Sequence, residues 1–190
     1  MQIVFATSNL NKIKEVQALI PKHIKLLSLT DIGCFEEIPE TQNTIEGNAI
    51  QKALYIKEKY GYDCFADDTG LEVDVLNGEP GVFSARYAGE QRSANDNMDK
   101  LLDALKDAKN RSAQFKTVIA LQLNNQQHIF TGICKGEITN TKHGDSGFGY
   151  DPIFKPNGYD KTFAEMDLSL KNSIGHRGKA ITQLINFLNS

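Results

Sequence analysis

The stretch IVFATSNLNKIKEVQALI, residues 3–20, joins a short apolar run to an amphipathic pattern with only a brief polar turn between them. Residues 3–6 are predicted to form a buried strand, and apolar residues then recur at helical spacing over residues 10–20. Ser8 and Asn9, which lie between the two patterns, are favourable helix N-cap residues. The stretch therefore predicts a strand that turns directly into a helix, which is typical of an α/β fold.

The turn at residues 7–12 is also a candidate anion site. The N-terminus of a helix has unpaired backbone N–H groups and the positive end of the helix dipole, and Lys12 adds a full positive charge. Phosphate groups bind readily at such a terminus. The chain has no Walker A sequence, so the turn is not a P-loop. The alternative interpretation is an ordinary capped turn without a ligand.

Length and composition are typical of one soluble domain, residues 1–190, which is expected to have two lobes. The net charge of −3 does not support a nucleic-acid partner, because such proteins usually carry a basic face. No apolar run approaches the ~18 residues of a membrane span. No export signal is visible either, so we expect a cytoplasmic protein without a membrane partner. The three cysteines are far apart, which favours reduced core thiols over a disulfide framework or a zinc site.

The remaining chain alternates predicted strands and helices. The predicted strands cover approximately residues 24–29, 63–66, 71–75, 114–124 and 127–138. The predicted helices cover approximately residues 44–61, 94–107 and 177–188. The two long strands are joined by turn residues 124–126 and form a hairpin, whose strands are antiparallel. The predicted fold class is therefore α/β with a mixed sheet.

Asp67 and Asp68 are adjacent carboxylates at the predicted end of a buried strand. Paired acids at such an end commonly hold Mg²⁺, which prefers carboxylate and water oxygens and often bridges to substrate phosphates. Neighbouring strand residues point to opposite faces, so one acid would face the other side of the sheet unless the backbone turns there. The alternative is a polar turn after the strand. Glu40, in a separate polar loop, would be unremarkable alone.

The glycine-rich loop at residues 144–152 contains two large aromatic residues, Phe148 and Tyr150. Its glycines allow the backbone to approach a ligand closely, and an aromatic side chain there is well placed to stack on a nucleobase. The alternative is that both aromatics cover the core. Basic residues at 171–177 precede the last helix, and surface charge with a helix cap is their alternative interpretation. Together these clusters are typical of an enzyme that acts on a nucleoside triphosphate with Mg²⁺.

Taken in order along the chain, these clusters resemble the inosine triphosphate pyrophosphatase family, the noncanonical purine nucleoside triphosphate pyrophosphatases of the Ham1/RdgB type. The resemblance extends over nearly the whole chain, and the combination of segments is far more specific than any one of them. The matching segments are residues 7–15, 40–41, 48–53, 66–71, 80–81, 84–89, 147–152, 154, 171–173 and 176–177.

The resemblance implies a mixed α/β fold in which helices flank a long curved mixed sheet, with two lobes and an active site in the central cleft. It also implies Mg²⁺-dependent hydrolysis of ITP, dITP and XTP to the monophosphate and pyrophosphate, which cleanses the nucleotide pool. Members of the family are usually homodimers, so a homodimer is expected here.

The resemblance also implies roles for individual residues. Asp68 would be the general base that deprotonates water, and it would bind Mg²⁺ together with Glu40, with Asp67 in support. Phe148 would stack on the purine. The residues implied to contact the substrate are Thr7, Ser8, Asn9, Leu10, Asn11, Lys12 and Lys52 at the triphosphate, Thr69, and Phe148, Gly149, Tyr150, Asp151, Lys171, His176 and Arg177 around the base.

The chain departs from the family pattern at three places, one of them a dipeptide. The dipeptide Gln-Asn at residues 42–43 replaces a glycine-containing step after residues 40–41, and Gly47 stands where an acidic residue is frequent. Gly175 precedes His176 where serine is usual, so a cap or a hydrogen bond near the base is expected to be lost. These departures bear on fine specificity more than on the reaction.

Two other functions are open from the sequence. A Maf-like nucleotide pyrophosphatase with another base preference is disfavoured by Phe148 and by the pair at residues 176–177. A nucleotide-binding module without catalysis is disfavoured because a mere binder would not need three acids at these positions.

Overall fold

The first strand and helix form where the sequence predicts them. In the computed structural model, which describes all 190 residues, β1 (Gln2–Phe5) is followed by α1 (Leu10–Gln17) with Asn9 as the N-cap. The Asn9 side chain accepts hydrogen bonds from the backbone N–H groups of Asn11 and Lys12, at 3.0 and 3.2 Å. Two of the donors that a helix N-terminus leaves unpaired are thereby satisfied within the chain.

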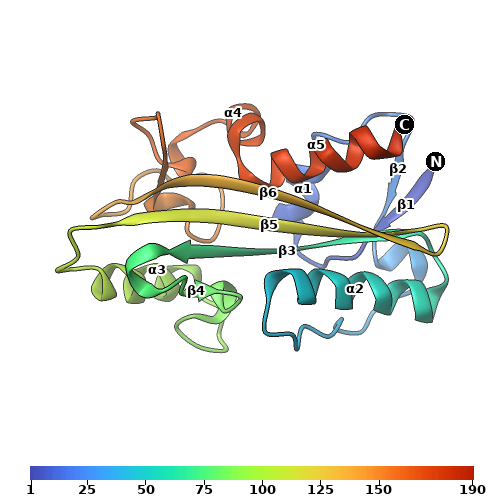
Figure 1. Cartoon of the computed structure of the whole chain (residues 1–190), viewed down its shortest axis with the longest axis horizontal. Coiled ribbons are helices and arrows are strands. Elements are labelled where there is room, and N and C mark those ends of the chain that lie inside the picture. Colours follow the sequence, from blue (N-terminus) through green and yellow to red (C-terminus); the bar gives the residue numbers. More distant parts are fainter. The chain divides into compact units, whose positions relative to one another are not determined.

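The sheet is mixed, as predicted. Its other strands are β2 (Lys25–Leu27), β3 (Cys64–Val73), β4 (Pro80–Gly81), β5 (Ser112–Leu123), β6 (Gln126–Ile138) and β7 (Phe154–Pro156). The strand order is β2-β1-β3-β5-β6-β7, and β4 pairs with β3 (Figure 1). β1 is parallel to both β2 and β3, whereas the pairs β3–β4 and β6–β7 are antiparallel. The predicted mixed α/β class is confirmed.

The other helices are α2 (Ile45–Tyr60), α3 (Ala94–Ala104), α4 (Leu168–Ile174) and α5 (His176–Leu188). The prediction for α2 is confirmed at both ends, because Thr44 caps it and Gly61 ends it in the left-handed conformation, with φ +77°. Helix α4 was missed, because its 7 residues are too few to establish a helical period in the sequence. None of the helices combines the length and apolar character that a membrane crossing requires.

The hairpin of β5 and β6 is confirmed to within two residues of its predicted bounds. Its turn residues, Asn124 and Asn125, both have positive φ, of 50° and 61°. Asparagine tolerates this conformation better than most residues, and two such residues in succession suit the right-handed twist of the flanking strands.

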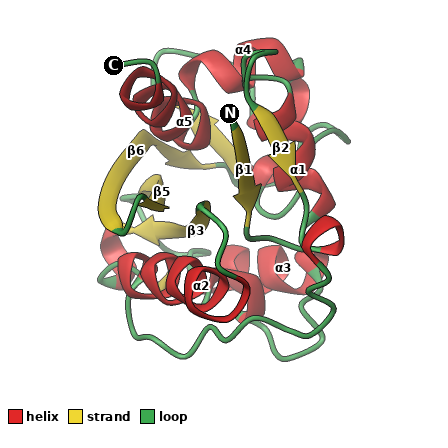
Figure 2. Cartoon of the chain, turned by 90° about the vertical axis from the view of Figure 1, so that its right-hand side faces the viewer, coloured by secondary structure: helices red, strands yellow, loops and turns green.

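The chain divides into two compact units, each described separately below. Unit 1 consists of Met1–Asp68, Thr117–Gly132 and Arg177–Ser190. Within it, α1 and α5 cover one face of the strands and α2 covers the other (Figure 2). Side chains of β1, β3, β5, α1 and α5 form its core. Phe5 stacks there on Phe65, with ring centroids 4.6 Å apart. This packing brings α1, α5 and β3 together around Asp67.

Unit 2 consists of Thr69–Lys116 and Ile133–His176. Its core joins α3 to β3, β5, β6 and the segment after β6. Three phenylalanines lie at its centre: Phe115 has an edge-on contact with Phe154 at 4.7 Å and stacks with Phe163 at 6.0 Å. The same core includes Tyr150 of the glycine-rich loop.

The prediction that a strand ends before the acid pair is wrong. Strand β3 continues from Cys64 to Val73, so Asp67 and Asp68 lie inside it. Two charged residues interrupt a buried strand only if partners compensate their charge. Those partners come from helices distant in the sequence, as described below, so no local sequence pattern predicts them.

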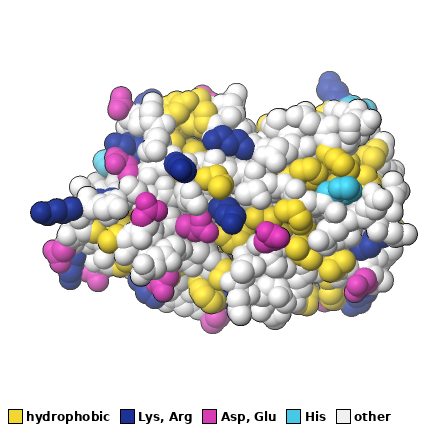
Figure 3. Space-filling view, viewed as in Figure 1, with side chains coloured by type: hydrophobic (Ala, Val, Ile, Leu, Met, Phe, Trp, Pro, Cys, Tyr) yellow, Lys and Arg dark blue, Asp and Glu magenta, His cyan; other side chains and the backbone are white.

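The surface and the cysteines add two observations. On the face shown in Figure 3, basic, acidic and apolar side chains are interspersed, without a continuous basic area.

Cys34, Cys64 and Cys134 are buried free thiols, as predicted. Burial raises the pKa of Cys64 to about 12.

Candidate functional site

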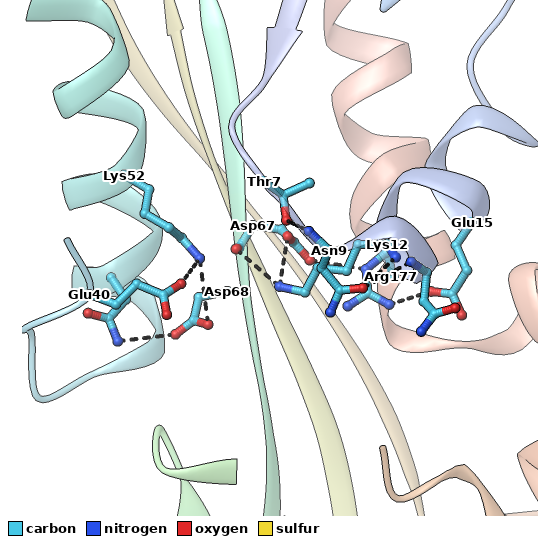
Figure 4. Close-up of polar contacts among 11 residues, drawn as sticks. Thr7, Asn9, Lys12, Glu15, Glu40, Lys52, Asp67, Asp68 and Arg177 are labelled. Atoms are coloured by element: carbon cyan, nitrogen blue, oxygen red, sulfur yellow. Dashed lines mark hydrogen bonds and ion pairs between the residues drawn. The ribbon is translucent and has the colours of Figure 1, made fainter. Parts of the chain in front are cut away.

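Asp67 is the centre of a buried ion network in unit 1 (Figure 4). Its Oδ1 accepts a hydrogen bond from Lys12 Nζ at 2.9 Å, and its Oδ2 accepts one from Arg177 Nε at 3.0 Å. Arg177 also forms a close ion pair with Glu15. The side chains of Glu15, Arg177 and Asp67 are at most 6% exposed. The four residues therefore form a chain of alternating charge, Glu15–Arg177–Asp67–Lys12, which we call the buried ion network.

The network determines the charge state of Asp67. Burial alone would raise the pKa of its carboxyl, but the positive charges of Lys12 and Arg177 outweigh burial and hold this pKa well below its usual range. For the basic Arg177, burial would lower the pKa, but the negative charges of Asp67 and Glu15 outweigh burial and raise it. Asp67 is therefore ionised, with each carboxylate oxygen bonded to a cation.

Asp68 points to the opposite face of β3, toward α2 (Figure 4). Its Oδ1 lies 3.9 Å from Lys52 Nζ, and its Oδ2 accepts a 3.4 Å hydrogen bond from Asn48 Nδ2. Lys52 Nζ also forms a close ion pair with Glu40 Oε1. Glu40, Lys52 and Asp68 thus form a second charged cluster, the carboxylate–lysine group.

The two acids therefore do not share one binding site for a cation. The strand period places Asp67 in the buried ion network and Asp68 in the carboxylate–lysine group, as the alternation of side chains predicted for an unturned backbone. The acid that lies on the same face as Asp68 is Glu40, from the loop before α2. No three acidic, histidine or cysteine side chains come together in a way that would hold a metal ion without further ligands.

Electrostatics in the carboxylate–lysine group differ from those around Asp67. Burial raises the pKa of Asp68, and the attraction of Lys52 and Lys12 offsets this only in part. Burial would lower the pKa of Lys52, but Asp68 and Glu40 outweigh it and raise this pKa. The group thus combines a charged lysine with a carboxylate that binds a proton more readily than usual.

The predicted anion turn is partly occupied by its own side chains. Asn9 Oδ1 already accepts from the N–H groups of Asn11 and Lys12, and Thr7 Oγ1 accepts from the N–H of Asn9 at 3.2 Å. Ser8 and Leu10 are exposed, and the Leu10 side chain is 79% exposed although its spacing predicted a core position. At the first helical position, Leu10 precedes the turn that packs on the strands, so it lies outside the core.

The loop before α2 explains two departures from the family pattern together. A Cβ atom added at Gly47 would lie 2.8 Å from Gln42 Cβ and 2.9 Å from Thr44 Oγ1. Contacts this close require a neighbour to move, and Gln42 Cβ belongs to the backbone end of its side chain. Gln42 therefore occupies the space that a side chain at position 47 would need, and the two departures are complementary.

We expect a double-mutant cycle to measure this complementarity. Gly47→Ala in the wild-type chain should lower the free energy of unfolding by about 1–3 kcal/mol, because the added methyl group overpacks against Gln42. In a Gln42→Gly background the contacts with Gln42 are removed and only the one with Thr44 Oγ1 remains, so this cost should be smaller, by about 1 kcal/mol or more with the better helix propensity of alanine. Urea unfolding of the four proteins gives the coupling. Additive effects would contradict the complementarity.

In unit 2, Phe148, Asp151 and Lys171 are brought together. Lys171 Nζ donates to Asp151 Oδ2 at 2.6 Å and lies 4.9 Å from the ring centroid of Phe148. The same Asp151 oxygen accepts a 2.8 Å hydrogen bond from the backbone N–H of Phe148. Gly147 has φ +78°, and a Cβ atom there would overlap Asp151 Oδ2, so the loop needs glycine at this position. Asp151 thus binds both the backbone N–H of Phe148 and the ammonium group of Lys171, which lies near the half-buried Phe148 ring.

Other residues predicted around the base are parts of the core. Tyr150 is 4% exposed, and its hydroxyl donates to the carbonyl oxygen of Ser84 at 2.9 Å. For Tyr150 the interpretation as core cover is therefore correct. His176 is also buried and stacks on Phe115 with centroids 4.5 Å apart. Gly149 and Thr69 are half-buried, in the loop and in β3.

Arg177 is bonded in a way that sequence reasoning did not foresee, because its guanidinium binds Asp67 and Glu15 within unit 1. Sequence reasoning also missed Glu15 and Asn48, which complete the two charged clusters. Both lie in matched segments, and Glu15 follows Lys12 at i+3 on the same helix face. That spacing was the one local signal available for Glu15.

The chain is similar to several known proteins. Residues 3–187 match the model of the Ham1 family. A dITP/XTP pyrophosphatase of Flavobacterium johnsoniae is 69% identical over 188 residues, covering 99% of this chain and 98% of that protein. A dITP/XTP pyrophosphatase of Porphyromonas gingivalis is 47% identical, covering 98% and 97%. Among solved structures, the Ham1 protein of Staphylococcus aureus is 39% identical, with a TM-score of 0.91 and coverage of 100% and 98%.

Proposed function

Because the chain belongs to the Ham1 family, we propose that it hydrolyses ITP, dITP and XTP to the corresponding monophosphate and pyrophosphate. The reaction breaks the α–β phosphoanhydride bond and removes these noncanonical purine nucleotides from the nucleotide pool. The observation that carries the proposal is the carboxylate–lysine group. It places a half-buried carboxylate of raised pKa beside a second carboxylate and a charged lysine, on one face of β3.

Glu40 and Asp68 are the residues that would hold Mg²⁺. The residues present fit this ion, because the space between the two carboxylates already accepts a cation, the ammonium group of Lys52. Mg²⁺ commonly takes only one or two protein carboxylates and completes its coordination with water and substrate phosphates. When bound, it would supply positive charge to the phosphate oxygens. Asp67 would support this site indirectly, by holding Lys12 and Arg177.

Asp68 would act as the general base. Water attacks the α-phosphorus, a new P–O bond forms, and the water proton passes to the Asp68 carboxylate while the bond to the β-phosphate oxygen breaks. Burial raises the pKa of Asp68 and so makes it a better proton acceptor near neutral pH. Lys52 and Lys12 would stabilise the negative charge that develops on the leaving pyrophosphate. Asp67 holds Lys12 in place for this role.

Phe148 and Lys171 would recognise the purine. The half-buried ring of Phe148 would stack on the base, and Lys171 would donate to its 6-oxo group. An adenine would instead present its amino group to this donor, so that two donors face each other, a mismatch that costs a factor of up to ~10⁴–10⁵. In this proposal Asp151 orients Lys171, and the buried Tyr150 and His176 support the loop from the core.

Three further parts of the proposal follow from the family resemblance: the metal is Mg²⁺, the protein is a homodimer, and the chain is one domain with two lobes. A fourth part, action in the cytoplasm, follows from the sequence prediction. Size-exclusion chromatography with light scattering measures the mass in solution and tests the homodimer directly.

The test of the reaction is incubation of the purified protein with ITP, XTP, GTP and ATP, each with Mg²⁺, and identification of the products by chromatography. We expect IMP and XMP with pyrophosphate, little turnover of GTP or ATP, and no turnover when EDTA removes the metal. IDP with orthophosphate would place the cleavage at another bond and reject the mechanism. No product from any nucleotide would favour a Maf-like base preference or a module that only binds nucleotides.

A further inference from the structure

Asn48 is a buried amide of α2 that touches both the Asp68 carboxylate and the loop that follows Glu40. It is 3% exposed. Its Oδ1 accepts a 2.9 Å hydrogen bond from the backbone N–H of Gln42, and its Nδ2 donates to Asp68 Oδ2 at 3.4 Å. One side chain therefore joins the strand that carries one acid to the segment that carries the other.

The orientation of this amide follows from its partners. The backbone N–H of Gln42 is a donor and must face the amide oxygen, whereas the Asp68 carboxylate is an acceptor and must face the amide nitrogen. Turning the amide over would oppose two donors at one end and two acceptors at the other. The Gln42 contact thus fixes which end of Asn48 meets Asp68.

Helical spacing places Lys52 one turn after Asn48, so both reach the same carboxylate from α2. Lys52 Nζ lies 3.9 Å from Oδ1 of Asp68, which is beyond hydrogen-bond distance, while Asn48 bonds Oδ2. Asn48 is therefore the neutral donor that sets the rotation of the carboxylate, and it leaves the other oxygen facing the lysine.

We infer that Asn48 is a positioning residue, which orients the Asp68 carboxylate and ties it to the loop that carries Glu40. The inference rests on the proposed function, in which Asp68 takes the proton from water. Without the Asn48 donor, the carboxylate can rotate away from the direction in which it accepts that proton, although both acids are still present.

Gln51 offers a matched control on the same helix. Its Oε1 accepts from the backbone N–H of Thr41 and its Nε2 donates to Thr41 Oγ1, both at 2.9 Å. Gln51 therefore tethers the same loop through two hydrogen bonds but has no contact of this kind with Asp68. A fall in kcat that comes only from a loosened loop should also appear in Gln51→Ala. A fall in kcat that comes from a misoriented Asp68 carboxylate should not appear in Gln51→Ala.

The experiment measures kcat and KM for ITP at saturating Mg²⁺ in four proteins: wild type, Asn48→Asp, Asn48→Ala and Gln51→Ala. Asn48→Asp keeps the acceptor for Gln42 and removes the donor to Asp68, whereas Asn48→Ala removes both. We expect kcat to fall between about tenfold and a hundredfold in both Asn48 variants, because a misplaced reacting group costs about this much. KM should change by less than about threefold, since the ground-state contacts are unchanged. Gln51→Ala should keep kcat within about threefold.

Crystal structures of the same proteins, grown without metal, give a readout that does not depend on turnover. The Asp68 carboxylate should be rotated in Asn48→Ala and keep its orientation in Gln51→Ala. An unchanged carboxylate in Asn48→Ala, or a kcat within threefold of wild type in both Asn48 variants, would overturn the inference. An equal loss in Gln51→Ala would assign the effect to the loop and also overturn it. Wild-type protein without hydrolysis would instead reject the proposed function, and the crystal structures would still test the role of Asn48.

Discussion

Replacement of Asp68 by asparagine is expected to lower kcat for ITP hydrolysis by about 10²–10⁴-fold, the range that a general base contributes. The amide has the size of the carboxylate but cannot take a proton from water. Its oxygen can still accept from Asn48 Nδ2, which donates to Asp68 Oδ2 at 3.4 Å in the wild-type chain, so its nitrogen would face the Lys52 ammonium group. The fold should persist, because Asp68 is the outer of the two acids and its side chain is 14% exposed.

Steady-state kinetics with ITP and Mg²⁺, together with circular dichroism of the folded variant, measure this effect. The control is Asp63→Asn, just before the same strand, where the carboxylate pairs with Lys57 at 2.8 Å and is 31% exposed. That change should leave kcat within about twofold, because Asp63 is not part of the proposed site and a partly exposed ion pair contributes little to the stability of the fold. Full activity of Asp68→Asn would remove Asp68 as the base.

Replacement of Asp67 by alanine, one residue earlier, is expected to act on stability rather than on proton transfer. It leaves Arg177 and Lys12 without their shared carboxylate in a buried environment. Breaking a buried pair by removing one partner costs about 3–5 kcal/mol of unfolding free energy, because the remaining charge is uncompensated. For a chain of this size such a loss is a large fraction of the total stability.

Urea unfolding at pH 7 measures the loss, and Asp107→Ala, which removes an exposed carboxylate in a turn, is the control. The control should change the unfolding free energy by less than about 0.5 kcal/mol. An equal and small effect of both changes would show that the buried ion network contributes little net stability.

The pH dependence of unfolding gives a second readout of the same carboxylate. The pKa of Asp67 is lower in the folded than in the unfolded chain, because Lys12 and Arg177 outweigh the effect of burial. Its contribution is therefore fully present above the unfolded value of 3.8 and is lost as the pH falls toward the folded value. Wild-type stability should decrease below about pH 4, and this decrease should be smaller in Asp67→Ala.

The parts of the fold that could be predicted are those set by near neighbours in the chain. Asn9 and Thr44 cap their helices, and Gly61 ends α2, because each acts on backbone groups within four residues. The turn of the long hairpin follows from Asn124 and Asn125, which accept positive φ. These signals are local, so a single sequence is enough to find them.

The errors arose where long-range packing outweighs local pattern. The acid pair resembled the end of a strand, yet β3 continues because Lys12 and Arg177 compensate Asp67 from positions 55 and 110 residues away. Tyr150 resembled a ligand-facing aromatic, yet it lies in the core and bonds Ser84, 66 residues away. Residues separated by 55 to 110 positions show no helical or strand periodicity that would indicate their contact from the sequence.

The candidate site shows the same division. Alternation along a strand was enough to predict that Asp67 and Asp68 face opposite sides, and the motif order was enough to indicate the family and the acids involved. The partner of each acid depends on which helix covers which face of β3. α1 and α5 bring Lys12 and Arg177 to one side, and α2 brings Lys52 and Asn48 to the other. Burial raises the pKa of both carboxyls, but the partner charges outweigh burial at Asp67 and lower its pKa, whereas at Asp68 they do not and its pKa stays raised.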